Sequence, residues 1–380
     1  MIYFFDYKLT YFIYVLVSKL YFHHTILTRF SLHAKCGNNK GLKRWCNNLK
    51  QEIVEAVLEA FAVGDAVGMP TEFMTRQQIK ERFDQVSGLI PPELSLTHNN
   101  LKFASITDDT EQNMYLVDEY CQKGRIDVKE TALCLLRWAK ETDAAGKKYI
   151  GPSSLKALKA IEEGADPYKT GLNGTTCGGI MRTPAAVFCT HEIETASLVK
   201  NVLNCLIPTH YTSTALEAAM AYAFALKEAF NKDTSINAII DAALLGAAEG
   251  MESAPYKMCA ASSEDRIRYL RKIMPTFQTA DDLLDFLYSI YGAGLESEDI
   301  CPAVFGIFLY AKDDVWLAIR LSASMGGDTD TVAALAAALC CAYAKGHNIP
   351  ENVLSTVLIE NNLDLNTMSK DIAAIGGSTK

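Results

Sequence analysis

The chain has 380 residues, of which 49% are hydrophobic and 21% are charged, so it can bury a core of ordinary size. Its formal net charge of −9 divides into +7 for residues 1–50 and −16 for residues 51–380, and an acidic body disfavours non-specific binding to nucleic acid. The 11 cysteines show no paired CxxC spacing, which argues against a zinc site or a disulfide scaffold and favours buried, reduced thiols in a cytoplasmic protein.

Residues 1–50 differ in composition from the rest, being rich in Tyr, Phe, Leu and Lys. The apolar stretch at 11–17 is much shorter than the roughly 20 residues that a membrane-spanning helix needs. We therefore predict an N-terminal extension that is disordered or weakly helical, without a clear membrane span. A membrane anchor or a targeting segment is the alternative for these fifty residues.

From residue 51 onward the hydrophobic pattern is helical. In the segment 51–66, apolar residues recur with the spacing of three and four that is typical of an amphipathic helix. The same reasoning predicts helices at 110–121, 128–140, 212–230, 236–248, 264–273, 280–291, 301–311, 313–323 and 329–345. No run alternates long enough to predict a sheet, and no linker divides 51–380. We expect an all-α protein with a single compact multi-helix domain over 51–380.

Two short segments place oxygen-bearing side chains at the start of predicted helices. They are TDDT at 107–110 and GGDTDT at 326–331. Asp and Thr are also common helix N-caps, so one such segment alone would indicate only a cap. The second segment precedes an almost wholly apolar helix, and no Lys or Arg lies between 322 and 344 to pair with Asp328 or Asp330. Because buried carboxylates are costly unless they are paired or bind a metal, the two segments together predict a site for two hard divalent cations.

Three further segments carry weaker signals. In 64–73, Asp65 is compatible with a hydrogen-bonded core carboxylate, and Glu72 with a surface acid or a cleft residue. The glycine-rich loop at 173–184 offers backbone N–H groups to a phosphate, although such loops are common. His210, at the start of a predicted helix, would by itself be interpreted as structural.

Taken together and in this order, the segments resemble the ADP-ribosylglycohydrolase family. The resemblance rests on GDAVGMPTEF (64–73), TDDT (107–110), GGIMRTP (178–184), THYTSTA (209–215) and GGDTDTVAALAAAL (326–339). It covers roughly 51–380. It implies an all-α fold of the ADP-ribosylglycohydrolase type, with the site in a cleft between helix ends, and an activity that removes ADP-ribose from a protein side chain or a small molecule.

The resemblance also implies roles for individual residues. Two Mg²⁺ ions, with Mn²⁺ as the alternative, would bind at Thr107, Asp108, Asp109, Asp328, Asp330 and Thr331. Glu72 corresponds to the family's mobile acid near the metals, and we expect a catalytic role for Glu72, Asp108 and Asp109. Gly178, Gly179 and Met181 correspond to the loop that binds ADP-ribose, and His210 to a residue that lines the ligand cleft. Where the family commonly has Asn in its GNGxAMR loop, this chain has Cys177.

Two other functions stay open at this point. A non-catalytic relative could keep the fold and serve as a binding or structural protein, and the departure at Cys177 favours that alternative. A two-metal phosphoesterase is the second alternative, although such an enzyme would normally use histidine ligands. For either enzyme we expect a monomer whose substrate is not a nucleic acid.

Overall fold

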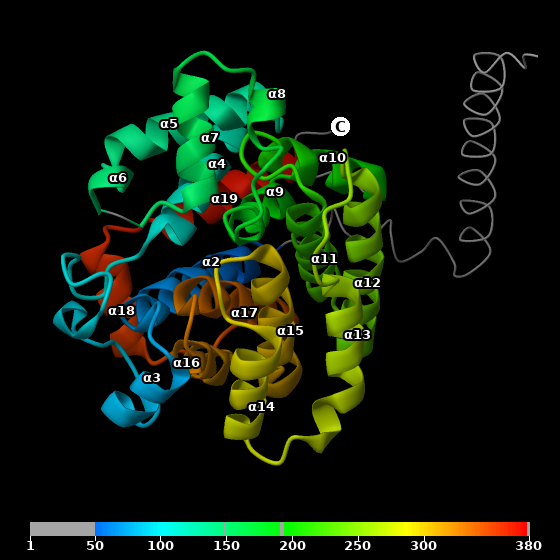
Figure 1. Ribbon diagram of the computed structural model, residues 1–380. Helices are drawn as coiled ribbons and strands as arrows, with labels where there is room; N and C mark the ends of the chain where they lie inside the picture. The colour runs from blue at the N-terminus through cyan, green and yellow to red at the C-terminus, as the bar shows by residue number, and fades with distance from the viewer. Residues whose placement is uncertain (1–49, 148, 191–193, 378–380) are drawn as a thin grey trace, which may run out of the picture. The chain divides into compact units, whose positions relative to one another are not determined.

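The structure is a computed structural model that describes residues 50–147, 149–190 and 194–377 (Figure 1). All the described residues belong to one compact unit. The predicted extension, and the alternatives for it, lie outside the described residues. Within the described ranges no helix is long and apolar enough to cross a membrane.

The described residues are helical and contain no β-strand, apart from one isolated bridge between Thr176 and Glu296. The elements run in chain order as α2 (Gln51–Gly68), η2 (Met69–Thr71), α3 (Arg76–Phe83), η3 (Pro92–Leu94), α4 (Asp108–Lys123), α5 (Val128–Glu141), α6 (Ala144–Lys147), α7 (Pro152–Glu162), α8 (Pro167–Thr170), η4 (Ile180–Arg182), α9 (Thr183–Phe188), α10 (Thr195–Leu206), α11 (Ser213–Ala229), α12 (Ile236–Ser253), α13 (Ser263–Ile273), η5 (Met274–Thr276), α14 (Ala280–Phe286), η6 (Leu287–Tyr291), α15 (Ser297–Ala311), α16 (Val315–Met325), α17 (Thr329–Ala344), α18 (Glu351–Glu360) and α19 (Leu365–Gly377).

Each predicted helix is present, so the predicted all-α class is confirmed. Most ends agree within a few residues. The largest internal difference is at 280–291, where α14 ends at Phe286 and a π-helical turn, η6, continues to Tyr291. The short helices α6, α8 and α9 were not predicted, nor were the longer α3, α7, α10, α18 and α19. None of them adds a strand or changes the fold class.

Helices α2 and α17 lie side by side at the centre of the helical unit (Figure 1), where glycine permits a very close approach. A Cβ atom on Gly64 would lie 2.5 Å from the Ala333 carbonyl oxygen, and one on Gly68 would lie 2.5 Å from that of Thr329. Every residue from 329 to 342 is buried, as the apolar sequence of this helix predicts. The close packing brings the C-terminal end of α2 next to the N-terminal end of α17.

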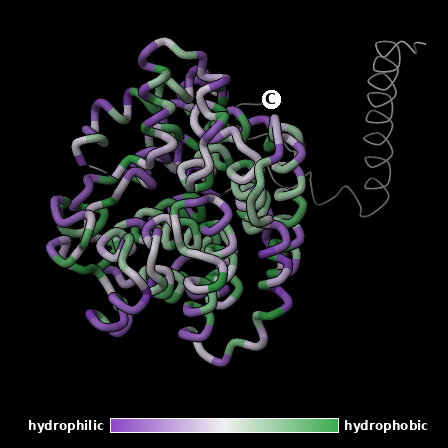
Figure 2. Tube along the Cα trace, in the orientation of Figure 1, coloured by the Kyte–Doolittle hydropathy of each residue, from purple (hydrophilic) through white to green (hydrophobic). Residues whose placement is uncertain are grey.

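Other helices enclose this central pair. Helices α15 and α16 pack against α17, α19 packs against α2, and α11 pairs with α12. The hydrophobic colours in Figure 2 concentrate on the inner helices, whereas the connections are more hydrophilic. The start of α4 lies beside both α2 and α17, since both helices contact it. Three helix ends therefore meet in one place.

Candidate metal centre

The two oxygen-rich segments predicted at helix starts converge in space. Asp108 and Asp109 begin α4, and Asp328 is the N-cap residue of α17. The Thr331 hydroxyl, in the first turn of α17, donates a hydrogen bond of 3.2 Å to Oδ2 of Asp109, 222 residues away in the sequence. All six predicted metal ligands are buried: Thr107, Asp108, Asp109, Asp328, Asp330 and Thr331. The structure therefore brings together carboxylates from distant parts of the chain, as the sequence predicted.

Asp65 holds the start of α4 against α2. Its carboxylate accepts hydrogen bonds from the backbone N–H and the hydroxyl of Thr107, and from the same two groups of Thr110. These bonds are 2.6–3.1 Å long, and the side chain is completely buried. The interpretation of Asp65 as a hydrogen-bonded core carboxylate is confirmed. Its effect on the site is to fix the position of α4, and hence of Asp108 and Asp109.

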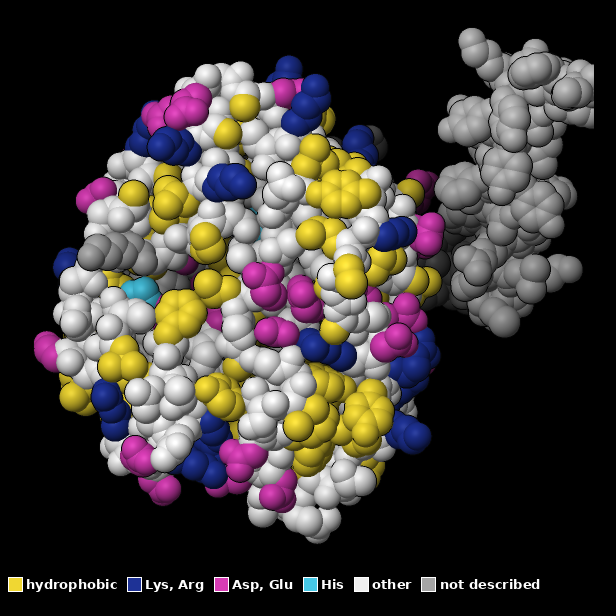
Figure 3. All heavy atoms as spheres, in the orientation of Figure 1, with side chains coloured by type: hydrophobic (Ala, Val, Ile, Leu, Met, Phe, Trp, Pro, Cys, Tyr) yellow, Lys and Arg dark blue, Asp and Glu magenta, His cyan; other side chains and the backbone are white. Residues whose placement is uncertain are grey.

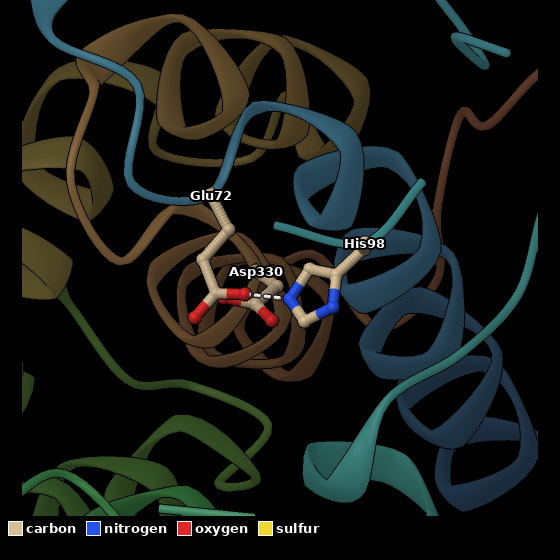
Figure 4. A group of neighbouring side chains, drawn as sticks. All are labelled: Glu72, His98 and Asp330. Atoms are coloured by element: carbon tan, nitrogen blue, oxygen red, sulfur yellow. Dashed lines mark hydrogen bonds and ion pairs between the residues drawn. The ribbon is translucent and has the colours of Figure 1, made fainter. Parts of the chain in front are cut away.

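Glu72 faces the cluster instead of solvent. It follows η2, its residue is 8% exposed, and its side chain points toward Asp330 and His98 (Figure 4). The surface-acid alternative for Glu72 is therefore wrong. Directly after Glu72, Phe73 N–H donates to the Gly327 carbonyl (2.8 Å), and Gly327 N–H donates to the Met74 carbonyl (2.9 Å). These bonds attach the segment that carries Glu72 to the loop that precedes Asp328.

His98 is a member of the cluster that the sequence did not reveal. Its Nε2 is hydrogen-bonded to Oε2 of Glu72, and the residue is only 2% exposed. One ligand atom from each of Glu72, His98 and Asp330 lies within 4.8 Å of the other two (Figure 4). His98 lies in the irregular connection between η3 and α4, where no helical pattern marks it.

Burial and mutual repulsion raise the pKa values of the carboxyl groups. Burial raises the pKa of Asp65 to about 7 and that of Asp328 to about 6, aided by the charges of Asp330 and Glu72 respectively. Burial, followed by the charge of Asp330, also raises the pKa values of Glu72, Asp108 and Asp109 well above the usual range. Such shifts describe a cluster that lacks positive charge of its own.

The residues present fit divalent cations. Oδ1 of Asp109 and Oδ2 of Asp328 are buried and accept no hydrogen bond. Among the described residues, no Lys or Arg forms an ion pair with Asp108, Asp109, Asp328 or Asp330. Carboxylate and hydroxyl oxygens are the ligands that hard divalent ions prefer. Buried oxygens without donors are what such an ion would satisfy.

The glycine-rich loop lies beside this cluster. Cys177 N–H donates to the Leu295 carbonyl (2.7 Å), which anchors the loop, and the Thr331 hydroxyl lies 3.9 Å from the Cys177 sulfur. The Met181 carbonyl accepts a hydrogen bond of 2.8 Å from Asn113 of α4. Burial, and then the nearby Asp328 carboxylate, raise the pKa of the Cys177 thiol well above its usual range. The residue that departs from the family pattern is therefore a protonated thiol next to a predicted metal ligand.

His210 lies behind the loop. It is completely buried, and a Cβ atom on Gly178 would lie 2.7 Å from its Cε1 atom. Its Nε2 is bonded to the Thr176 hydroxyl (3.1 Å), and its Nδ1 to the Thr209 hydroxyl (2.7 Å). Gly179 also packs against His210. Because neither glycine has a side chain, Gly178 and Gly179 leave room for the imidazole. A direct contact of His210 with a ligand stays a prediction.

Arg182 connects the loop to α4 and was not among the predicted site residues. Its guanidinium is fully buried and donates to Oε1 of Gln112 (3.0 Å), while Gln112 donates to Oδ2 of Asp108 (2.9 Å). It also bonds to Thr209 and His210. The Arg182 charge therefore reaches Asp108 only through a neutral amide. Its place in the GGIMRTP segment was the available signal.

In the described residues, buried carboxylates without an ion-pair partner gather at three adjoining helix ends and form a candidate site for divalent cations. Comparison with known sequences indicates the class of protein. The sequence profile of the ADP-ribosylglycohydrolase family matches residues 47–376, and the chain belongs to this family. Family membership supports a hydrolase that acts on ADP-ribose linkages.

Individual relatives agree with this assignment. YegU of Escherichia coli K12, itself uncharacterised, is 29% identical over 327 residues, covering 86% of this chain and 97% of YegU. An uncharacterised protein of Archaeoglobus fulgidus is 28% identical, covering 77% of this chain and 87% of that protein. The ADP-ribosylarginine hydrolase Tri1 of Pseudomonas putida is 29% identical over 187 residues, which is 47% of this chain and 46% of Tri1.

A solved structure shows the same fold. It is described as an ADP-ribosylglycohydrolase-related protein complex, and it superposes with a TM-score of 0.59 at 22% sequence identity. The alignment covers 87% of this chain and 99% of the other. At this identity the likeness supports the fold alone, and it confirms the predicted fold type.

Proposed function

We propose that this chain hydrolyses the glycosidic bond between ADP-ribose and a modified acceptor, using two divalent cations. The observation that carries the proposal is the convergence of Asp108, Asp109, Asp328 and Asp330, buried and without protein counter-charge, in a member of this family. Mg²⁺ is the proposed cation and Mn²⁺ the alternative. The six proposed ligands are Thr107, Asp108, Asp109, Asp328, Asp330 and Thr331.

Bound cations would supply positive charge that positions the distal ribose hydroxyls and polarises the reacting centre. The chain supplies the proton transfers and the positioning. Asp108 and Asp109 are proposed to orient the attacking water and accept its proton. Glu72, with a pKa raised first by burial, can retain a proton and donate it to the leaving group. Carboxylates on both sides would also stabilise the positive charge of an oxocarbenium-like transition state.

The glycine-rich loop is the proposed binding site for the rest of ADP-ribose. Gly178 and Gly179 present backbone without side chains, and their amides suit the pyrophosphate oxygens. The buried Arg182 behind the loop adds positive charge near the same position. Cys177 keeps the loop anchored through its backbone, which supports a functional loop even though the family Asn is missing.

The proposal is tested by a panel of ADP-ribosylated substrates, each assayed with Mg²⁺ and with chelator. ADP-ribosylated arginine enters first, because Tri1 is named for that substrate. We expect release of free ADP-ribose that chelator abolishes, and no release by Asp328→Ala, which should also fail to bind cations. Asp364→Asn, a change of a helix-flanking acid on the surface, is the matched control.

Three outcomes would contradict the proposal. Release of AMP in place of ADP-ribose would identify a phosphoesterase. Cation binding without turnover on any substrate would identify a non-catalytic relative, the alternative that Cys177 favours. Full activity of Asp328→Ala without bound cation would remove the metal from the mechanism.

The other predictions about partners follow from the same proposal. The substrate is an ADP-ribosylated protein or a small molecule that contains ADP-ribose, and nucleic acid is not expected to bind. On the face drawn in Figure 3, lysine and arginine side chains are scattered among acidic and apolar ones and form no continuous basic surface. A monomeric state and a cytoplasmic location are proposed with it.

A further inference from the structure

His98 introduces an imidazole into a cluster that otherwise offers oxygen atoms. Two hydrogen bonds hold the backbone of His98 in place. Its backbone N–H donates to the Ser95 hydroxyl (3.0 Å), and its carbonyl accepts from Leu101 N–H (3.1 Å). With 2% of the residue exposed, the ring has little freedom to move away.

The surroundings of the ring are those of a metal ligand. Its neighbours are two carboxylates, Glu72 and Asp330, and one ligand atom of each of the three residues lies within 4.8 Å of the others (Figure 4). Its Nε2 atom faces the Glu72 carboxylate, and its Nδ1 atom has no hydrogen-bond partner that would fix the tautomer. One imidazole and two carboxylates form a donor set that is typical of divalent transition ions.

A second histidine in the same region shows the contrast. Both ring nitrogens of His210 are engaged, one by Thr176 and the other by Thr209 and Arg182. His210 therefore has no free lone pair for an ion, and it lies next to a guanidinium. Of the two buried histidines near the cluster, only His98 faces carboxylates.

We propose that Glu72, His98 and Asp330 form one of the two cation positions, and that the imidazole makes this position selective for a transition ion such as Mn²⁺ over Mg²⁺. Mg²⁺ requires near-ideal octahedral oxygen coordination, whereas Mn²⁺ and its heavier neighbours readily accept an imidazole nitrogen. The proposal deepens the proposed function and rests on it for the second position, with Asp330 shared between the two ions.

The site replaces an existing contact. In the structure, Nε2 of His98 bonds to Glu72, and an ion between them would accept a lone pair from each in place of that hydrogen bond. Glu72 would then be held by the ion as well as by its backbone, and in this arrangement it would serve as a cation ligand instead of donating a proton to the leaving group. Binding at this position would release a proton wherever Glu72 or the imidazole carries one.

The test measures binding directly, without substrate. The full chain is stripped of metal and loaded with Mn²⁺, and pulsed electron paramagnetic resonance is used to detect ¹⁴N coupling from a coordinated imidazole. We expect the coupling in the unchanged chain and its loss in His98→Gln. The matched control is His347→Gln, which alters a histidine paired with Glu59 elsewhere and should keep the coupling.

Affinities provide a second readout. Titration of the metal-free chain with Mn²⁺ and with Mg²⁺ should show that His98→Gln weakens Mn²⁺ binding at one position by about tenfold or more, while Mg²⁺ binding changes by less than about threefold. Equal weakening of both ions would overturn the proposal. Absence of ¹⁴N coupling in the unchanged chain would also overturn the proposal. This second result does not depend on whether a variant folds.

These results are separable from the failure of the proposed function. A chain that shows ¹⁴N coupling but releases no ADP-ribose keeps this site and loses the glycosidase. A chain that releases ADP-ribose with Mn²⁺ bound and shows no coupling keeps the glycosidase and loses this site.

Discussion

Two groups of acidic residues in this molecule have opposite surroundings. Asp281 and Asp285 lie on α14, about half exposed, and share the buried guanidinium of Arg76 and the amine of Lys80. Although partial burial works against it, the Lys80 hydrogen bond and the Arg76 charge lower the pKa of Asp281. The carboxyl groups of the metal centre are buried, have no such partners among the described residues, and have raised pKa values.

The two groups differ in the source of the positive charge that balances their carboxylates. On α14 the chain supplies it through Arg76 and Lys80, so those acids are complete without any ligand. At the candidate metal centre the four aspartates have no ion-pair partner among the described residues, and the buried Arg182 reaches Asp108 only through Gln112. We therefore expect the balancing charge to come from cations in solution.

The largest effect is expected at Asp330, because its charge raises the pKa of so many neighbours. Asp330→Asn should lower the rate of ADP-ribose release by about 10³-fold or more and remove at least one bound cation. The metal-free variant should nevertheless unfold at a higher temperature than the metal-free parent, since one source of buried repulsion is gone. Lower stability together with retained cation binding would contradict the contrast.

The second prediction concerns pH. Asp65 and Asp328, with pKa values of about 7 and about 6 in the folded chain, hold protons there that they lose in the unfolded chain near 3.8. The folded state then binds more protons, so the metal-free chain should lose stability as the pH rises from about 4 to about 7. Cations compete with those protons, so the stabilisation they give should increase over the same range.

Thermal unfolding at several pH values, with chelator and with saturating cation, measures this. At a free cation concentration 100 times its Kd, the gain above pH 7 should approach about 3 kcal/mol. A gain that does not depend on pH would mean that the carboxyl groups are already ionised without metal.

The third prediction concerns removal of the positive charge that the protein itself supplies to the acids of α14. Arg76→Met removes the partner of Asp281 and Asp285 and also the donor of a 2.7 Å hydrogen bond to the Ser324 carbonyl. We expect a loss of about 1–3 kcal/mol in the free energy of unfolding, mostly from the unsatisfied carbonyl, because the two acids can face water. Denaturant unfolding measures it, and added cation should not restore the loss.

The smallest effect is expected at Asp281 itself. Its ion pairs are half exposed, and such pairs contribute at most about 1 kcal/mol. Asp281→Asn should therefore leave cation binding and turnover unchanged and alter unfolding by less than that amount. A strong loss of cation binding would show that the two acidic groups are not independent.

Helices could be predicted from the sequence where their buried apolar residues recur with a regular helical spacing. Helix α17 has almost only small and apolar residues after its first turn, and its burial from 329 to 342 could be predicted. Helix α3 could not, because its eight residues bury only Arg76 and Ile79 and show no apolar period. Helix α10 has the regular pattern Leu198, Val202, Cys205 and was predictable although it was not predicted.

The site was only partly accessible to the same reasoning. The aspartates at the starts of α4 and α17 could be identified because helix starts and an apolar helix gave them context. His98 could not, because it lies in an irregular connection and reaches Glu72 only through tertiary packing. The burial of Glu72 depends on the same packing, which local sequence does not encode.

The two backbone hydrogen bonds between the Phe73–Met74 segment and Gly327 couple the movements of the two segments. Phe73 has a φ of 60°, and Gly326 and Gly327 have φ values of 90° and 80°. Both of the hydrogen-bonded segments therefore contain residues with positive φ. A substrate that displaces Glu72 must therefore also shift the loop leading to Asp328. We therefore expect an insertion in either loop to alter the positions of both Glu72 and Asp328.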